Sequence, residues 1–282
     1  MSTPSHSSSQ FSSDPSFDTG RALQAARHLH TLWQRDAVTD ALPEAVRPRT
    51  RAEGYAVQAA LRTLHGGEVP GWKIAATSVA GQRHIGVSGP LAGPIYAGRV
   101  YNDGASVSLN GNRMRVAECE ITFRFARTLS PRAAPYSVDE VLAAVGTVHP
   151  AIEVPDSRFA HFETACEAQL IADNACCRDY LLGPGLAVDS AVTARVRALP
   201  AHEVHAECSD GRRFSGMGAN VLGDPLLALA WIVNELSAVG VPMKAGQFVT
   251  TGACVVPIPV LPGDEVRADF GWLGRMRVRF TA

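Results

Sequence analysis

The texture of the chain changes after residue 70, and this change most constrains the fold. Short apolar runs rich in valine, isoleucine and phenylalanine alternate with turns of glycine, proline, asparagine and aspartate, a pattern typical of β-strands. The spacing of these runs is not the regular strand-helix alternation of a parallel α/β sheet. The expected strands cover 71–76, 105–109, 114–126, 149–154, 202–208, 248–251, 254–259, 265–270 and 275–281.

Helices are predicted before and between these strands. A capping box, in which Thr50 is followed three residues later by Glu53, marks the start of one of them. Another begins with Asp224 as N-cap and Pro225 at its first position, and Gly240 ends it. The expected helices cover 21–35, 50–65, 137–145, part of 163–172 and 225–239.

The chain divides into three expected segments. Residues 1–19 are rich in serine, which favours a disordered tail. Residues 20–70 form an N-terminal helical segment, and residues 71–282 form a β-rich catalytic domain. A chain of 282 residues is long enough for one large domain or two smaller ones.

Composition and charge exclude several classes of protein. A net charge of -1 and a pI near 6.8 give no electrostatic reason to bind nucleic acid. The longest apolar run, Leu226 to Val233, is too short to span a bilayer, and the chain starts without the apolar stretch of a secretory signal. The six cysteines form no C-x-x-C pair, so no zinc or redox motif is expected. We therefore expect a cytoplasmic protein with reduced thiols and no membrane partner.

Three carboxylates lie within apolar, strand-like segments. Glu118 and Glu120 are two residues apart, so on a strand they project from one face, while Cys119 and Ile121 project from the other. Glu153 lies near the end of another apolar strand. Because a buried carboxylate must be paired or must hold a metal, the three together predict a hard oxygen site suited to Mg²⁺ or Mn²⁺. The alternative is an ordinary half-exposed strand with solvent-facing glutamates.

Lys73 is the candidate ammonium group. It lies in the apolar segment that begins at Gly71, and the only other lysine of the chain is Lys244. A lysine carries a compact charge whose pKa burial can move, which an arginine does not. Lys73 is therefore a candidate general acid/base, or an anchor for a substrate carboxylate beside the metal. The alternative is a side chain that reaches solvent from the edge of a strand.

Several short segments, taken in order, resemble the 2-keto-4-pentenoate hydratase branch of the fumarylacetoacetate hydrolase superfamily over roughly residues 20–282. The segments are Gly71-Trp-Lys-Ile74, Thr77-Ser78, Glu118-Cys-Glu120, Pro150-Ala-Ile-Glu153, Asp156-Ser-Arg158, Ala172-Asp-Asn-Ala175, Val221-Leu-Gly-Asp-Pro225, Ala230-Trp231, Ala245-Gly246, Thr250-Thr-Gly252, Pro262-Gly-Asp264 and Leu273-Gly274. Two stretches differ from the family pattern, since residues 86–93 contain no acidic residue and Cys176-Cys177 stand where serine is usual.

The resemblance implies a fold and a metal site. The family has an α+β fold, in which a rolled, mixed β-structure of the fumarylacetoacetate hydrolase C-terminal type follows a small helical segment. Its members bind Mg²⁺ or Mn²⁺ and form homo-oligomers. Carried over to this sequence, the metal ligands are Glu118, Glu120 and Glu153, and the catalytic lysine is Lys73.

The resemblance also implies an activity. The expected enzyme is a metal-dependent hydro-lyase that adds water to a 2-hydroxy-2,4-dienoate or 2-oxo-3-enoate and releases a 4-hydroxy-2-oxo acid. The substrate, a small 2-oxo acid, is expected to contact Thr251, Arg158 and Ser78. The alternatives are a decarboxylase of an oxalocrotonate-type 2-oxo-3-enedioate, an acylpyruvate hydrolase, and a structural partner subunit in a complex with a related decarboxylase or hydratase.

Overall fold

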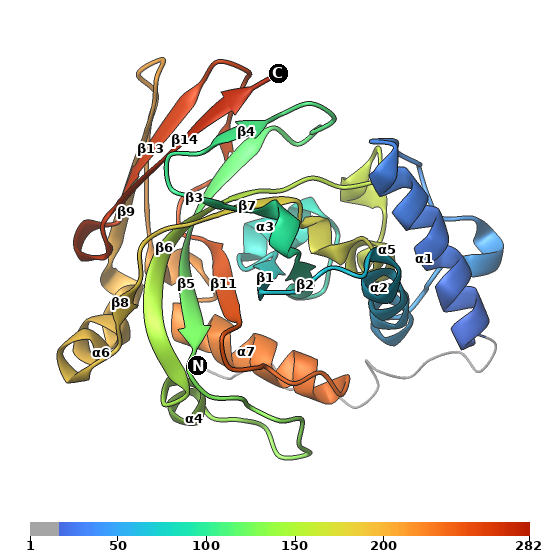
Figure 1. The fold of residues 1–282 in the computed structure, drawn as a ribbon, viewed down its shortest axis with the longest axis horizontal. Coiled ribbons are helices and arrows are strands. Elements are labelled where there is room, and N and C mark those ends of the chain that lie inside the picture. Colours follow the sequence, from blue (N-terminus) through green and yellow to red (C-terminus); the bar gives the residue numbers. More distant parts are fainter. Residues whose placement is uncertain (1–16) are drawn as a thin grey trace.

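The computed structural model describes residues 17–282, so the predicted tail lies almost wholly outside the described residues (Figure 1). The helices are α1 (Thr19–Gln34), α2 (Arg51–His65), α3 (Val79–His84), α4 (Val138–Leu142), α5 (Glu167–Ala172), α6 (Ser190–Arg197) and α7 (Pro225–Ala238). The strands are β1 (Gly71–Ala75), β2 (Leu91–Ile95), β3 (Val100–Asn102), β4 (Ser106–Ser108), β5 (Val116–Phe125), β6 (Val145–Val154), β7 (Asp179–Leu182), β8 (Leu186–Ala187), β9 (Glu203–Cys208), β10 (Arg213–Met217), β11 (Phe248–Ala253), β12 (Ile258–Pro259), β13 (Glu265–Asp269) and β14 (Arg275–Thr281).

The strands form two sheets. The larger has nine strands in the order β2-β1-β11-β5-β6-β7-β3, with β12 paired to β5 and β8 paired to β6. The smaller has five strands in the order β10-β9-β13-β14-β4. Both sheets are mixed, because β1 runs parallel to β11, β3 to β7 and β14 to β4, while the other pairs are antiparallel. The long strands β5 and β6 curl strongly (Figure 1), as expected for a rolled, mixed β-structure.

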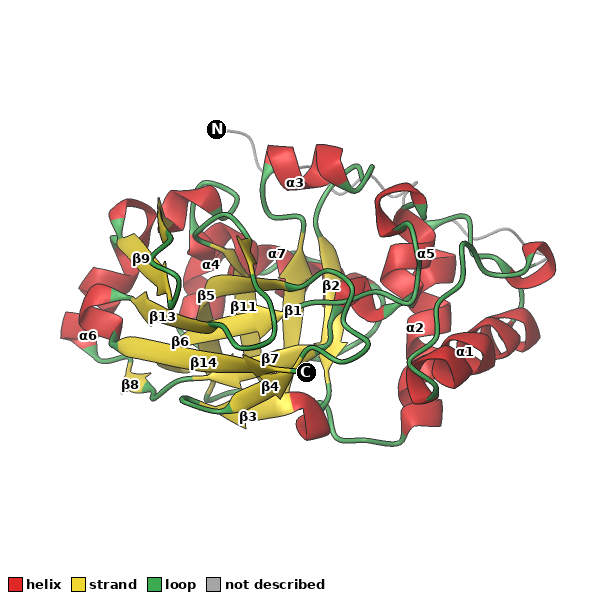
Figure 2. Ribbon diagram, turned by 90° about the horizontal axis from the view of Figure 1, so that it is seen from above, coloured by secondary structure: helices red, strands yellow, loops and turns green. Residues whose placement is uncertain are grey.

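The helices gather at two places around the curled sheet. Helices α1, α2 and α5 pack together beside the β1–β2 edge (Figures 1 and 2). Arg51, at the start of α2, binds Glu167 at the start of α5 and Glu235 on α7, with N–O distances of 2.5 Å in both pairs. These buried ion pairs fasten the N-terminal helices to the rest of the chain.

Helix α7 packs against β11 and α4 and has most of its residues buried. Residues 218–238 form the one helical stretch of residues 17–282 with the length and apolar composition of a membrane span. Of this stretch, 61% is buried inside the protein, as in the core helix of a globular domain.

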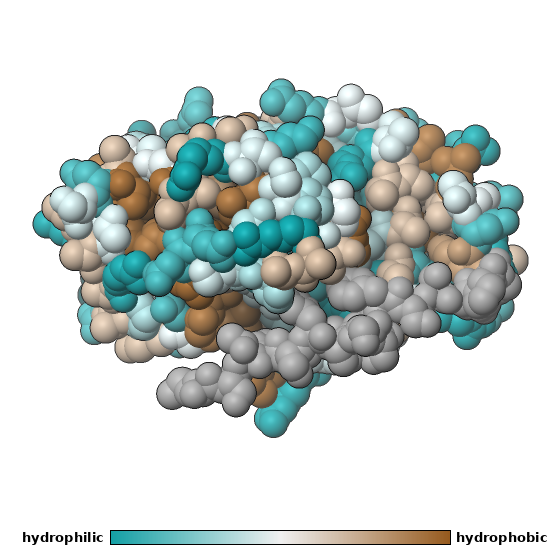
Figure 3. All heavy atoms as spheres, turned by 90° about the horizontal axis from the view of Figure 1, so that it is seen from below, coloured by the Kyte–Doolittle hydropathy of each residue, from teal (hydrophilic) through white to brown (hydrophobic). Residues whose placement is uncertain are grey.

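Figure 3 shows the molecule from below the view of Figure 1. Hydrophilic and hydrophobic residues are mixed on this face.

Several predicted boundaries were wrong. The strand expected at 254–259 forms only at Ile258–Pro259, because Pro257 offers no N–H to a ladder. The helix expected to reach 145 ends at Leu142, and Val145 already begins β6. Strand β2 escaped prediction because Gly93 and Pro94 interrupt its apolar pattern. The division at residue 70 stays a prediction, although α2 ends at His65 and β1 begins at Gly71.

Candidate metal centre and active site

Three glutamates meet where β5 lies beside β6. Glu118 and Glu153 are directly opposed across this antiparallel pair, and Glu120 lies two residues along β5 on the same face. One carboxylate oxygen of each glutamate lies within 4.8 Å of the others. Cys119 and Ile121 are fully buried on the other face of β5, as the alternation predicts. The predicted convergence of the three carboxylates is therefore present in the fold.

The environment of these carboxylates fits a divalent cation. Glu120 and Glu153 are each 1% exposed. One oxygen of Glu120 and one of Glu153 are buried without a hydrogen-bond partner, and the other oxygen of Glu153 lies 3.1 Å from the ammonium of Lys73. Burial and mutual repulsion raise the pKa of Glu118 and of Glu120 to about 7, and burial raises the pKa of Glu153 to about 8. A cation such as Mg²⁺ or Mn²⁺ would supply the positive charge and the missing partners for these oxygens.

A β-bulge in β11 holds the carboxylate of Glu120 in place. The register between β11 and β5 shifts between Thr250 and Ala253, so that the chain folds over Glu120. One oxygen of Glu120 accepts a hydrogen bond from the Thr250 hydroxyl and another, 2.9 Å long, from the backbone N–H of Gly252. The other oxygen of Glu120 stays free to bind a ligand.

Lys73 lies in the same buried site. Its ammonium is 3.1 Å from a carboxylate oxygen of Glu153 and donates a 3.0 Å hydrogen bond to the backbone carbonyl of Ala175. Burial alone would lower the pKa of Lys73, but the charges of Glu153 and Glu118 outweigh it and raise that pKa above its usual value. Lys73 is 3% exposed, so it does not reach solvent from a strand edge.

The three expected substrate residues occupy different surroundings. Thr251 is fully buried, and its hydroxyl donates to the carbonyl of Ile121, whereas its neighbour Thr250 faces Glu120. Ser78 is the N-cap of α3, where its hydroxyl accepts a hydrogen bond from Gly81. Their roles toward a substrate stay predictions.

Arg158 belongs to a second buried polar cluster. Its guanidinium binds Asp156 and stacks on the ring of Trp33, with its central carbon 4.7 Å from the ring centroid. The backbone N–H of Arg158 donates to Asp173 over 2.7 Å. Within residues 17–282, no ion pair or hydrogen bond joins Arg158 to Glu118, Glu120 or Glu153. A direct contact between Arg158 and a substrate stays a prediction.

Sequence reasoning missed two residues that touch the carboxylate site. Gly252 adopts φ = 111°, and a Cβ there would lie 2.1 Å from the hydroxyl of Thr77. Thr77 is therefore packed against the turn that holds Glu120. The sequence carried a signal for both residues, since Thr77 precedes Ser78 and Gly252 follows the two threonines of β11, but only the fold brings them together.

The cysteines give no sign of nucleophilic chemistry. All six are free, and five are buried. Burial raises the pKa of Cys176 and Cys177 above the usual thiol value, so neither is a thiolate near neutral pH.

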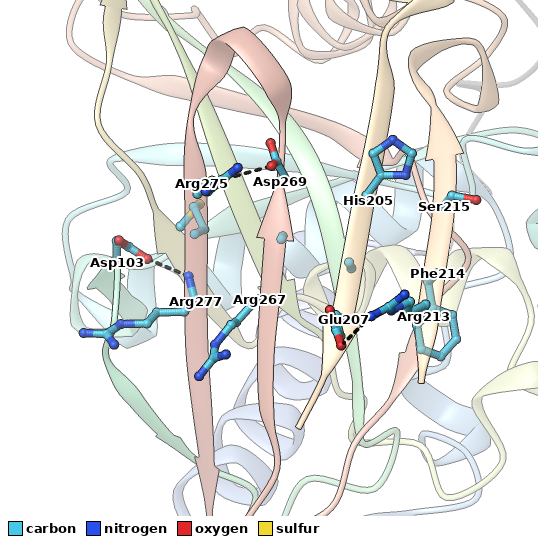
Figure 4. Close-up of a pocket in the computed structure, with 13 residues that line it drawn as sticks. Asp103, His205, Glu207, Arg213, Phe214, Ser215, Arg267, Asp269, Arg275 and Arg277 are labelled. Carbon is cyan, nitrogen blue, oxygen red and sulfur yellow. Dashed lines mark hydrogen bonds and ion pairs between the residues drawn. The ribbon is translucent and has the colours of Figure 1, made fainter. Parts of the chain in front are cut away.

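A hollow lies away from the carboxylates, on the exposed face of the five-stranded sheet (Figure 4). It has a volume of about 730 Å³, and its lining includes Arg213, Glu207, Arg267 and Arg277, which form one row across the strands. Two ion pairs, Arg213–Glu207 and Arg275–Asp269, lie in its lining, and none of the three glutamates lines it. The buried carboxylates, not this open trough, are therefore the candidate site.

Comparison with known proteins decides the family. No family model matches the chain. The chain is 33% identical over 233 residues to a 2-keto-4-pentenoate hydratase of Burkholderia vietnamiensis, which covers 80% of this chain and 85% of that protein. The chain belongs to the 2-keto-4-pentenoate hydratase/oxalocrotonate decarboxylase branch of the fumarylacetoacetate hydrolase superfamily.

Both kinds of enzyme in this branch resemble the chain. It is 31% identical over 269 residues to a 4-oxalocrotonate decarboxylase of Pseudomonas putida, covering 93% of this chain and 97% of that one. Among solved structures, the 4-oxalocrotonate decarboxylase from Pseudomonas putida G7, complexed with magnesium and adipate, superposes with a TM-score of 0.82 at 26% identity, covering 93% and 98% of the two chains. The protein is thus an enzyme of the fumarylacetoacetate hydrolase family, a hydratase or a decarboxylase, with the α+β fold of that family and a possible metal site.

Proposed function

We propose that the protein is a metal-dependent hydratase. It would add water to a 2-hydroxy-2,4-dienoate, in its 2-oxo-3-enoate form, and release a 4-hydroxy-2-oxo acid. The observation that carries this proposal is the convergence of half-buried Glu118 with buried Glu120 and Glu153, the last of which lies 3.1 Å from the ammonium of Lys73.

The three glutamates would hold Mg²⁺ or Mn²⁺. A bound divalent ion supplies a Lewis acid that polarises the 2-oxo and carboxylate oxygens of a 2-oxo acid. Thr250 and the N–H of Gly252 fix one oxygen of Glu120, which directs its other oxygen into the site. Burial of Glu120 and Glu153 excludes bulk water from the place where charge develops on the substrate.

Lys73 would hold or move a proton. Without a bound cation, the negative charges of Glu153 and Glu118 raise the pKa of Lys73 and so favour its charged form. A divalent cation would offset most of their charge, so burial, which favours the neutral amine, would then weigh more on this ammonium. Lys73 can then exchange a proton with the substrate or with the attacking water.

The charges around the site favour a monoacid substrate. The ammonium of Lys73 partly offsets the rise that burial causes in the pKa of all three glutamates. No arginine of the described chain forms an ion pair with any of them. Three ionised glutamates would already balance the charge of a divalent metal and the Lys73 ammonium, so each carboxylate of a substrate adds negative charge to the site. A diacid would bring a second carboxylate into a buried region without a further cation, which costs free energy. This supports hydration of a dienoate over decarboxylation of a dioate.

Decarboxylation is the second candidate. A specific observation favours it: the solved relative with a TM-score of 0.82 is a 4-oxalocrotonate decarboxylase complexed with adipate, which is a six-carbon diacid. The same metal and lysine could stabilise the enolate that forms when carbon dioxide leaves.

Product analysis tests the proposal. Purified protein is incubated with a 2-hydroxydienoate, an oxalocrotonate-type diacid or an acylpyruvate, each with and without Mg²⁺ or Mn²⁺. A metal-dependent 4-hydroxy-2-oxo acid is the expected product. Released carbon dioxide would replace the hydratase by the decarboxylase, and pyruvate with a free acid would make the protein a hydrolase. No metal-dependent turnover of any substrate would favour a structural subunit. Homo-oligomerisation, a mixed assembly and cytoplasmic location stay predictions.

A further inference from the structure

A short backbone turn holds the ammonium of Lys73. Residues Asn174, Ala175 and Cys176 all have positive φ, at 56°, 52° and 61°. Three consecutive non-glycine residues in the left-handed region are unfavourable and persist only where the surroundings enforce them. The middle carbonyl of this turn, that of Ala175, accepts the 3.0 Å hydrogen bond from Lys73.

Gly93 makes room for this turn. It lies on β2 directly opposite Lys73 on β1, and the turn packs against both strands. A Cβ on Gly93 would lie 1.9 Å from the carbonyl oxygen of Asn174 and 3.1 Å from the Cβ of Ala175. Any side chain at position 93 would therefore force the turn and β2 apart.

Buried hydrogen bonds fasten both ends of the turn. Before it, the carboxylate of Asp173 accepts hydrogen bonds from the indole N–H of Trp33 at 3.0 Å and from the Ser157 hydroxyl at 2.7 Å, besides the one from the N–H of Arg158. At its end, the carbonyl of Cys176 accepts a 3.0 Å hydrogen bond from the N–H of Asp156. The polar cluster around Arg158 thus acts on the active site through the turn, without touching the glutamates.

We propose that residues 174–176 are a backbone clamp that orients the ammonium of Lys73 toward Glu153, and that Gly93 and Asp173 are positioning residues for the reaction. The clamp rests on the proposed catalytic role of Lys73. The clamp gives a function to the Ala172-Asp-Asn-Ala175 segment, which supplies no side chain to the group of three glutamates.

The test replaces Gly93 and follows Lys73 itself. In Gly93→Ala, kcat should fall by at least about tenfold with a smaller change in KM, since a 1 Å misplacement in a site can cost about 100-fold. Mn²⁺ alone should still bind, with a smaller loss of affinity than in Glu153→Gln, because Gly93→Ala keeps all three carboxylates and alters only Lys73, a partner of Glu153. Gly98→Ala is the matched control, since Gly98 is exposed and a Cβ there meets nothing within 4 Å.

A second readout does not depend on activity. The chain has two lysines, so ¹⁵N labelling of lysine gives one Nζ signal from buried Lys73 and one from exposed Lys244 as an internal reference. Gly93→Ala should shift the Lys73 signal, and Gly98→Ala should leave it unchanged. A folded Gly93→Ala protein with an unshifted Lys73 signal overturns the clamp, whatever its kcat. If wild type turns over no substrate, the proposed function fails, but the Nζ comparison still decides the clamp.

Trp33→Phe provides the test if Gly93→Ala does not fold. It removes one of the donors to Asp173 and keeps an aromatic ring beneath Arg158. The expected result is the same displacement of the Lys73 signal, smaller in size, with a several-fold lower kcat. An unchanged signal in this variant would overturn the link between Asp173 and Lys73 and with it the proposal.

Discussion

Glu118 on β5 and Glu153 on β6 are directly opposed across an antiparallel strand pair. Two like charges in this position repel one another, and a sheet normally avoids the arrangement. Here the repulsion is strengthened by burial and is relieved on one side by the ammonium of Lys73, 3.1 Å from Glu153. A site that gathers more negative than positive charge is prepared for a cation, and the first prediction follows from this imbalance.

Removing one carboxylate should weaken metal binding. In Glu153→Gln, the affinity for Mn²⁺ should fall by more than about 100-fold, because even outer partners of metal ligands contribute about 10–100-fold. Titration calorimetry measures this, with Glu203→Gln on the exposed face of β9 as control. In wild type, added metal should also raise the melting temperature, since it binds the folded chain and not the unfolded one. An unchanged affinity in Glu153→Gln would remove Glu153 from the metal site.

Replacing Lys73 should affect turnover more than metal binding. Lys73→Ala removes the ammonium and leaves the carboxylates, so Mn²⁺ should still bind. If Lys73 transfers a proton, kcat should fall by about 10²–10⁴-fold, whereas a change confined to KM would indicate an anchor that binds substrate and transition state equally. Lys244→Ala is the matched control, since Lys244 is exposed. Steady-state kinetics that match wild type in both parameters would exclude Lys73 from the mechanism.

The bulge in β11 allows a comparison between two glycines. Gly252 and Gly263 both have positive φ, 111° and 99°, but only Gly252 lies against another side chain, that of Thr77. Alanine at either position should cost about 1–3 kcal/mol of backbone strain. Only Gly252→Ala should also lower metal affinity and kcat, because its N–H holds Glu120 in place. Equal effects of both variants on metal affinity, corrected for stability, would contradict this function of the bulge.

His149 should make the fold sensitive to acid. Burial lowers its pKa below the usual 6.5, although its hydrogen bond to the Gly183 carbonyl acts the other way. Because the unfolded chain then binds protons more readily than the folded one, the free energy of unfolding should decrease as the pH falls from about 6.5 through the lowered pKa. His149→Gln should flatten this slope in urea titrations between pH 7 and about 5, a range that brackets the ordinary histidine pKa, and exposed His161→Gln should not. An equal slope in wild type and His149→Gln would assign the acid sensitivity to another group.

The convergence of the carboxylates was predictable in part. The i, i+2 spacing of Glu118 and Glu120 placed both on one face of a strand, and this is confirmed. The register that sets Glu153 opposite Glu118 could not be read from the sequence, because it depends on the helix and turns between β5 and β6. A shift of this register by one residue would turn Glu153 to the other face of the sheet.

The surroundings of Lys73 were harder to predict. The left-handed turn at 174–176 contains no glycine, and only Asn174 is of a residue type that favours positive φ. The importance of Gly93 becomes visible only from the Asn174 carbonyl that lies against it. The substrate roles of Ser78 and Thr251 came from their places in motifs and stay predictions, while the fold shows Thr250 bound to Glu120 and Thr77 packed against Gly252. Local spacing predicts which face a side chain takes, but long-range packing decides which of two adjacent residues reaches a site.

The parallel pairing of β1 with β11 also has a consequence for how the protein is made. Residues 71–73 pair with residues 248–250. Lys73 and the groups that bind Glu120, from Thr250 and Gly252, therefore come from parts of the chain separated by most of its length. Contacts of such long range form slowly, because a large loop must close first. During synthesis, the three glutamates emerge from the ribosome well before β11 can join them to Lys73. A nascent chain that ends before residue 248 should therefore lack the fixed geometry of the site, and competence to hold the metal should appear abruptly once this late strand is added.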